Sequence, residues 1–376
     1  MAEDAVNVGP VHPDAPLGVV WAGSAWRSEG TQVFALVSRD LDREHGPRAM
    51  ALDFFGHGFA VDPTEPARAA VFEKHGPGAA IVDLRRLACV MPLRPGPDRE
   101  FYGHGAFSRD GALLFATEIV KDPQRRGALG VYDGRTGARV GELPSGGVAP
   151  HDCALVDEGR VLVVGNGGGA LGQPEPPCVC WIDLADGRVL ERRALPDARF
   201  DVGHLAIDAA GDLAIVSAPR FGTPQPERAR GGLTLWPRGA AARTIDADAG
   251  DDALRHETVA AMIGETLSVA LHEPTRTVAS TNPQGHLLAF WDLDTGALRA
   301  RLRVPNPRGV ALTRDGSAYV VSFGVFGKLS RVDAHTLRPV DAPGNRDGLP
   351  TGATGSHLLV HHVAPAADAP VIALPL

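Results

Sequence analysis

The chain has 376 residues and a formal charge of −8, and 44% of its residues are hydrophobic. No cluster of Lys and Arg accompanies this acidic balance, so the sequence argues against nucleic acid as a partner. No stretch reaches the roughly 18 apolar residues of a membrane-spanning helix, and the four cysteines do not make a disulfide framework at this size.

Residues 1–16 contain acids and prolines but neither the basic nor the apolar segment of a signal peptide. We predict an irregular N-terminal extension over 1–16. As it stands, the chain is expected to be cytoplasmic; if an export signal has been removed, it is expected to be periplasmic. Two strands, at 17–22 and 32–38, follow the extension.

One half-unit recurs along the chain from residue 80 onward. It is a hydrophobic strand that ends in aspartate, then a turn and a second strand, and its copies lie at 80–85, 131–140, 181–190, 290–299 and 331–338. Asp and Gly at the centre of the unit favour a hairpin.

A second half-unit precedes the first by about 25 to 30 residues and in its fullest form reads His-Gly, four residues, Asp-Gly and then a strand. Its copies begin at His57, His104, His151, His204, Ser268 and Gly309. The two half-units together give four strands per repeat, which is the pattern of a β-propeller blade.

Six repeats lie between residues 55 and 340, and a further inner strand begins near His357. Joined to the N-terminal strands, it completes a seventh blade. We therefore predict an all-β fold in which 1–376 forms a single seven-bladed β-propeller. One blade is closed by both termini, which protects the sheet edges.

The first position of each inner strand is the observation that bears on function. These seven positions read His57, His104, His151, His204, Ser268, Gly309 and His357, so that five of them are histidine in a chain with 14 histidines. Because the innermost strands of a propeller run along its axis, equivalent positions form a ring around the central channel. We expect the ends of the second strands at the same mouth, with Glu118, Asn166, Arg220, Asn282 and Ser322, and also Tyr102.

Neutral imidazole is a common metal ligand that suits Fe, Cu, Zn and Ni. We therefore predict a transition metal ion, iron or copper, bound by His57, His104, His151, His204 and His357. Glu118, Tyr102 and Arg220 are the predicted catalytic side chains. The expected function is metal handling or a metal-dependent oxidoreductase, with a metal ion or a small molecule as partner; the sequence leaves any protein partner open.

Two other functions fit the same residues. In a lactonase-type hydrolase, His104 or His151 would act as general base and Arg220 would steady an oxyanion. In an interaction scaffold of the WD type, the histidines would brace turns and face away from the channel, as Gly-His pairs and Trp291-Asp292 suggest.

Cys178 and Cys180 lie two residues apart, on one face of a predicted strand. They are interpreted as small buried residues and not as a metal site.

Residues 101–111, 114–118, 147–152 and 163–168 resemble the bacterial family called domain of unknown function 1513, and 199–206 and 282–292 are similar to its later blades. The resemblance implies a propeller that is often exported and often encoded near iron-uptake proteins of the imelysin type. The chain departs from the family pattern at Gly146-Gly147, where a Ser-His-like pair is expected, and at Asp152, where glutamate is commoner.

Overall fold

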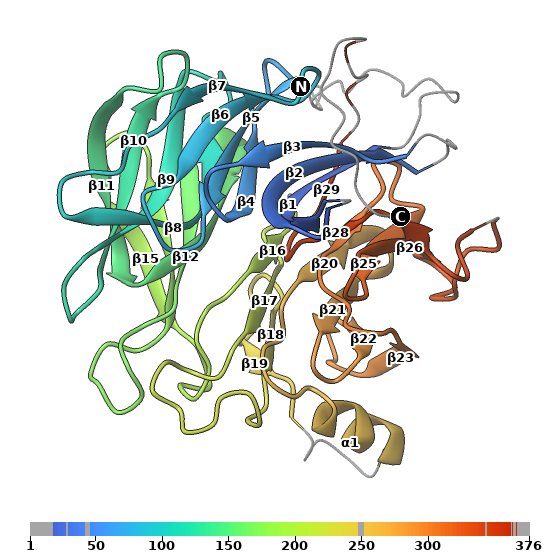
Figure 1. Ribbon diagram of the computed structural model, residues 1–376. Helices are drawn as coiled ribbons and strands as arrows, with labels where there is room; N and C mark the ends of the chain where they lie inside the picture. The colour runs from blue at the N-terminus through green and yellow to red at the C-terminus, as the bar shows by residue number, and fades with distance from the viewer. Residues whose placement is uncertain are drawn as a thin grey trace, which may run out of the picture.

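The computed structural model describes residues 18–27, 29–41, 46–246, 252–342 and 344–361, together with 363 and 366. The predicted extension over 1–16 lies outside the described residues. The strands form seven antiparallel sheets arranged in a ring (Figure 1), which confirms the predicted seven-bladed β-propeller.

The first three complete blades follow one another directly in the chain. Blade 1 contains β4 (Gly56–Val61), β5 (Arg68–Glu73), β6 (Ala79–Asp83) and β7 (Ala88–Pro92). Blade 2 contains β8 (Arg99–Phe107), β9 (Leu113–Val120), β10 (Arg126–Asp133) and β11 (Arg139–Val148). Blade 3 contains β12 (Pro150–Val156), β13 (Val161–Asn166), β14 (Cys178–Asp183) and β15 (Val189–Ala194).

The next three blades continue the ring. Blade 4 contains β16 (Leu205–Ile207), β17 (Leu213–Ser217), β18 (Gly232–Trp236) and β19 (Arg243–Thr244). Blade 5 contains β20 (Val269–His272), β21 (Thr277–Asn282), β22 (Leu287–Asp292) and β23 (Leu298–Arg303). Blade 6 contains β24 (Val310–Leu312), β25 (Ala318–Phe323), β26 (Lys328–Asp333) and β27 (Leu349–Pro350).

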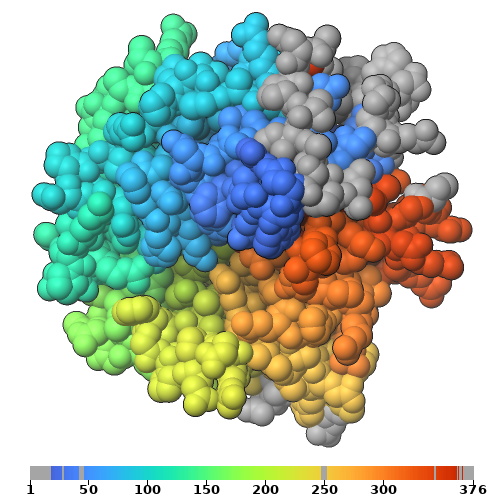
Figure 2. Space-filling model, in the orientation of Figure 1, coloured from blue at the N-terminus to red at the C-terminus, as the bar shows by residue number. Residues whose placement is uncertain are grey.

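Blade 7 is built from both ends of the chain. It joins N-terminal β1 (Gly18–Trp26), β2 (Gln32–Asp40) and β3 (Arg48–Leu52) to C-terminal β28 (Ala353–Thr354) and β29 (Leu359–Val360). Both C-terminal strands pair with β1. In Figure 2 the blue residues of this blade lie between the cyan residues of blade 1 and the orange-red residues of blade 6. The predicted closure by both termini is confirmed.

Helical structure is minor in the described residues. Single-turn 3₁₀ helices span Asp157–Gly159 and Glu273–Thr275, and α1 (Ala253–Ala260) packs Val259 against the core between blades 4 and 5. The Asp252 carboxylate caps α1 by accepting from the backbone N–H groups of Leu254 and Arg255. None of the helices in the described residues has the length and apolar character needed to span a bilayer.

The hydrophobic core is divided into layers between neighbouring blades. Seven buried clusters of described residues each join two adjacent blades. Because successive side chains of a strand point to opposite faces, Leu162 and Val164 of β13 pack toward blade 2, whereas Val163 packs toward blade 4. This alternation stacks the sheets around the ring and fixes the inner strands beside the axis.

The recurring aspartate at a strand end has a structural role in the outer hairpins. The Asp133 carboxylate accepts hydrogen bonds from the backbone N–H groups of Arg135 and Thr136. Asp292 and Asp333 hold the equivalent turns in the same way. The repeat therefore encodes the turn between the third and fourth strands of a blade.

Candidate metal centre

The five predicted histidines converge on the propeller axis. In the pairs of rings that are in contact, the distance between ring centroids ranges from 3.9 to 5.5 Å. The shortest distance joins His204 and His357, and the longest joins His57 and His204. His57, His104, His151 and His204 are buried, and His357 is partly buried. The interpretation in which these side chains face away from the channel and brace turns is therefore wrong for all five.

β-Bulges occur at three of the histidines. The register of the first two strands shifts between Gly56 and Gly58 around His57, and between Pro150 and Asp152 around His151. A similar shift between Phe101 and Gly105 includes His104. A bulge adds a residue to one strand and re-aims its side chain, so the local backbone turns these imidazoles inward.

Glycine keeps the space into which the rings pack. A Cβ atom on Gly103 would lie 2.9 Å from Cε1 of His151 and 3.1 Å from Cδ2 of His57. Gly103 also has a backbone φ of 113°, which residues other than glycine rarely adopt. Space is also restricted at Gly58, because its Cβ would lie 2.5 Å from Nδ1 of His104.

Three inward-facing nitrogens form a triangle. The Nε2 atoms of His57 and His151 are 3.3 Å apart, those of His151 and His204 are 3.0 Å apart, and those of His204 and His57 are 3.4 Å apart. Metal–nitrogen bonds of about 2.0–2.1 Å separate neighbouring ligands by about 2.8–3.4 Å in octahedral or tetrahedral geometry. The triangle therefore has the dimensions of one face of a metal coordination shell.

Two further histidines border this triangle. Nε2 of His357 lies 3.2 Å from Nε2 of His57. His104 contributes to a group of four buried histidines whose possible ligand atoms, one from each residue, all lie within 4.8 Å of one another. The cluster could therefore hold a metal ion with three or more imidazole nitrogens.

The outer nitrogens of two rings set their tautomers. Nδ1 of His151 lies 2.8 Å from the backbone carbonyl oxygen of Tyr102, and Nδ1 of His204 lies 2.6 Å from that of Leu267. A carbonyl only accepts, so both Nδ1 atoms carry the proton. In the neutral rings, the two Nε2 lone pairs then face each other across 3.0 Å with no proton between them. A cation at this position would satisfy both.

Asp152 braces a third ring. Its carboxylate lies 3.3 Å from Nδ1 of His104 and accepts hydrogen bonds from the backbone N–H groups of Cys153 and Leu205. Nε2 of His104 is buried and has no hydrogen-bond partner among the described residues. A carboxylate behind an imidazole orients the opposite nitrogen toward a metal and raises its basicity.

Burial keeps the cluster neutral. Desolvation lowers the pKa of all five histidines, and it lowers the pKa of His57, His151, His204 and His357 well below the ordinary value. The neighbouring imidazoles and Lys74 lower the pKa of His57, His151 and His357 further. Neutral imidazole is the form that binds a metal.

A hydroxyl group on the second strand ties the ring together. The Thr117 hydroxyl accepts from the backbone N–H of His104 and lies within hydrogen-bonding distance of the carbonyl oxygens of His104 and His151. Sequence reasoning missed Thr117, although a signal exists. Ser268 and Thr281, like Gly309 and Ser322, share its spacing of 13 residues and the same backbone-to-hydroxyl bond.

Glu118, a predicted catalytic residue, interacts with a different set of side chains. Its carboxylate is fully buried and accepts hydrogen bonds from the Tyr132 hydroxyl at 2.6 Å and the Arg139 guanidinium at 3.1 Å. Arg99 lies 3.9 Å from it. These partners neutralise and orient the carboxylate in blade 2, and its assistance to the metal centre stays a prediction.

The guanidinium of Arg220, also predicted to be catalytic, is occupied by backbone carbonyls. It donates to the carbonyl oxygens of Gly169 and Glu175 at 2.7 Å each, and to those of Gln173 and Ala198. Arg220 thus pins the loop that follows β13. Its catalytic role also stays a prediction.

Tyr102 is the predicted catalytic residue that lies directly against the cluster. Its ring is edge-on to that of His151 with centroids 5.5 Å apart, and its carbonyl accepts from the same histidine. Tyr102 also lines a pocket of about 670 Å³ together with Arg125, Asp201 and Arg220. Tyr102 therefore connects the histidine cluster to a space large enough for a small molecule.

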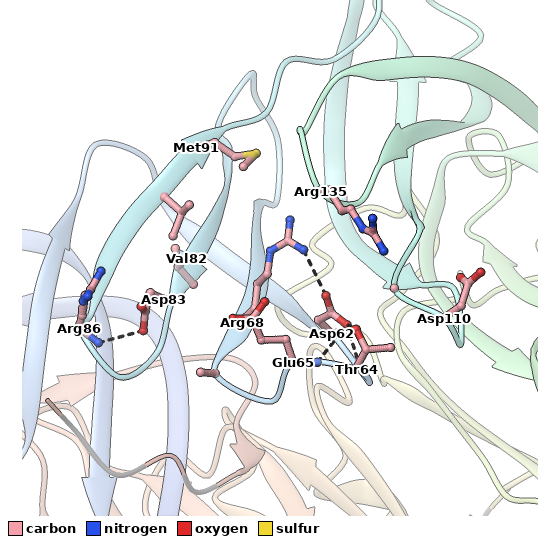
Figure 3. A pocket seen from close by; sticks show the side chains of 13 residues that line it. Asp62, Thr64, Glu65, Arg68, Val82, Asp83, Arg86, Met91, Asp110 and Arg135 are labelled. Atoms are coloured by element: carbon pink, nitrogen blue, oxygen red, sulfur yellow. Dashed lines mark hydrogen bonds and ion pairs between the residues drawn. The ribbon is translucent and has the colours of Figure 1, made fainter.

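The opposite end of the inner strand has a pocket of different character. This space of about 660 Å³ (Figure 3) begins at Asp62, immediately after β4. Asp62 pairs with Arg68 at 3.2 Å, and Asp83 accepts from the backbone of Arg86. The Asp62 and Asp83 carboxylates, which accept from nearby backbone N–H groups, therefore hold turns of blade 1.

Cys178 and Cys180 belong to the apolar cluster between blades 2 and 3, with sulfur atoms 3.9 Å apart. This agrees with their interpretation as small buried residues.

Comparison with known proteins gives a family and a fold. The family described as "Protein of unknown function (DUF1513)" matches residues 50–347. A solved structure of Kuenenia stuttgartiensis hydrazine synthase is 15% identical, with a TM-score of 0.61 over 88% of this chain and 99% of that chain. At this identity the similarity shows the propeller fold alone. No curated protein matches the sequence.

Proposed function

This chain belongs to the DUF1513 family, and we propose that its histidine cluster holds iron or copper in a metal-dependent oxidoreductase. The observation that supports this most strongly is the triangle of Nε2 atoms from His57, His151 and His204, with sides of 3.0–3.4 Å. In His151 and His204, Nδ1 donates to a backbone carbonyl, so the Nε2 lone pairs of these rings point at the shared centre.

The donor set supports a transition metal. Imidazole nitrogen suits Fe, Cu, Zn and Ni, whereas Mg²⁺ and Ca²⁺ take oxygen ligands. Among these ions the affinity of a nitrogen site rises along the first-row series to copper. Asp152 and the carbonyls of Tyr102 and Leu267 would hold the rings in place before the metal enters, which limits the loss of side-chain freedom on binding.

The adjoining pocket supports chemistry over a purely structural role. Structural metal sites are closed by protein ligands, whereas catalytic sites keep a position open for water or substrate. Here Tyr102 touches His151 on one side and lines a pocket of about 670 Å³ on the other. When bound, the metal would supply redox chemistry to a small molecule in that pocket. The proposed residues bind the metal and exclude bulk water from it.

The lactonase-type alternative has weaker support. It needs a free guanidinium to steady an oxyanion, and that of Arg220 already donates to backbone carbonyls of Gly169 and Glu175. The WD-type alternative assumes structural histidines that face away from the channel, and the rings converge instead.

Metal analysis of protein purified without a His-tag tests the proposal. We expect about one equivalent of iron or copper per chain after reconstitution of the metal-free protein, and its loss in the variant His151→Ala/His204→Ala. His256→Ala, at an exposed position on α1, is the matched control and should bind metal like the wild type. Equal, near-zero metal in wild type and double variant would overturn the metal site. Retention of zinc alone would overturn its redox role.

A further inference from the structure

One arginine in the pocket that Tyr102 lines forms no ion pair with any described carboxylate. Lys74 lies 4.0 Å from Glu265, and His75 lies 3.8 Å from Glu100. Arg125 lines the same pocket, and no described carboxylate lies within 4.0 Å of its guanidinium. An uncompensated cation in a concave site attracts an anion.

The side chain of Arg125 is held rigidly in place. Its guanidinium lies 5.0 Å from the ring centre of Tyr102 and 5.3 Å from that of Phe221, and it donates to the Tyr102 hydroxyl. Arginine stacked on aromatic rings keeps its planar donors pre-organised. Phe221, from blade 4, remains 63% exposed beside it, which offers an apolar surface to whatever the guanidinium binds.

The backbone of Arg125 has an uncommon conformation. Its φ is 51°, in the left-handed region, and its carbonyl accepts from the N–H of Ala149, whose φ is 54°. Such conformations in residues other than glycine persist where the surroundings enforce them and cluster at ligand sites. Here two of them hold the loop before β10 against the loop before β12, and both residues line the pocket.

The third carboxylate of the pocket, that of Asp201, is only partly ionised at neutral pH. Burial, reinforced by Glu265, raises the pKa of Asp201 to about 7. Its carboxyl oxygen accepts from the backbone N–H of Ala218. Below its pKa, Asp201 is mostly neutral and therefore offers little repulsion to an anion beside Arg125.

We propose that Arg125 binds the anionic group of a small organic substrate, whose apolar part lies on Phe221 and whose remaining end faces the histidine cluster past Tyr102. The inference deepens the proposed function and rests on it for the identity of the reacting centre. The substrate class is an organic oxyanion, either a carboxylate or a phosphate ester.

Calorimetric titration of the metal-free protein at pH 6.5 tests this site without relying on activity. The probes are benzoate, phenyl phosphate and the neutral analogue benzamide. We expect at least one anion to bind about tenfold or more tightly than benzamide, and the better anion identifies the charged group. Arg125→Gln should reduce anion affinity to the level of benzamide.

Two variants make the result specific. Arg126→Gln removes the neighbouring exposed arginine, which pairs with Asp122, and should leave the affinity unchanged. Phe221→Ala should lower the affinity for both the anion and benzamide by several-fold. Because Phe221 is exposed, the substitution should leave folding intact. Equal binding of anions and benzamide by the wild type, or unchanged anion binding in Arg125→Gln, overturns the proposal. So does the absence of binding by either anion at millimolar concentration.

The anion site and the proposed metal centre can be tested independently of each other. The variant His151→Ala/His204→Ala should lose metal and still bind the anion, whereas Arg125→Gln should lose the anion and keep its metal. A wild type that binds the anion but takes up no iron or copper on reconstitution refutes the oxidoreductase alone.

Discussion

The Nε2 atoms of His151 and His204 lie 3.0 Å apart, although the Nδ1 atom of each ring donates to a backbone carbonyl. The two residues come from adjacent blades, so a cation between their lone pairs would link blade 3 to blade 4. Because a ligand that binds only the folded state stabilises it by mass action, copper or ferrous iron should raise the melting temperature.

The expected gain is about 2.7 kcal/mol at a free metal concentration of 100 times Kd. Differential scanning calorimetry of metal-free protein, with and without added metal, measures it. The double variant His151→Ala/His204→Ala should show no such gain. A shift of equal size in both proteins contradicts the assignment of these ligands.

Acid should destabilise the metal-free protein strongly. The folded-state pKa of each clustered histidine lies below its ordinary value of about 6.5, so below that pH the unfolded chain binds protons that the folded protein does not. The free energy of unfolding therefore falls as the pH drops below about 6.5. Each histidine contributes a slope of up to about 1.4 kcal/mol per pH unit.

Urea unfolding between pH 5 and pH 7.5 measures that slope. His357→Gln removes one clustered histidine and should lower the slope by up to one histidine's contribution, whereas the exposed His256→Gln should leave it unchanged. Identical slopes in all three proteins contradict the prediction.

Gly103→Ala should disturb the centre without removing a ligand. The added Cβ would lie 2.9 Å from the ring of His151, and the backbone φ of 113° is unfavourable for alanine. We expect a loss of about 1–3 kcal/mol in stability, together with weaker metal binding. Gly141→Ala is the control, because its Cβ would meet no atom within 4 Å.

Thr117→Val should loosen the frame that holds two of the rings. The substitution keeps the shape of the side chain and leaves the backbone N–H of His104 without its acceptor. An unsatisfied buried donor costs about 1–3 kcal/mol. Chemical denaturation of Thr117→Val and Thr117→Ser measures the effect, and the serine variant should recover most of the loss because it retains the hydroxyl.

Asp152→Asn should weaken metal binding while all five histidines remain. Removal of a carboxylate behind a ligating imidazole typically lowers metal affinity about 10–100-fold. Competition with a chromogenic chelator measures the change. Asp110→Asn, at an exposed turn, is the control. Unchanged affinity in Asp152→Asn would mean that His104 does not ligate.

The sequence by itself determined the number of blades and the level along the propeller axis at which the histidines lie. Aspartates such as Asp133 mark the outer turns because the carboxylate binds the turn's own backbone, an interaction between residues close in the chain. Equivalent positions of repeated strands must lie at one level of a closed ring. The first residues of the inner strands, among them His57 and His204, therefore had to meet at one mouth.

Only the tertiary structure decided where the side chains point and what they contact. Bulges direct His57 and His151 toward the axis. Backbone carbonyls from neighbouring blades accept hydrogen bonds from the Nδ1 atoms of His151 and His204. Glu118, adjacent to Thr117 in the chain, turns instead to Arg139. The physical reason is that side-chain direction depends on backbone register and on partners distant in the sequence, and the spacing of residues along the chain encodes neither.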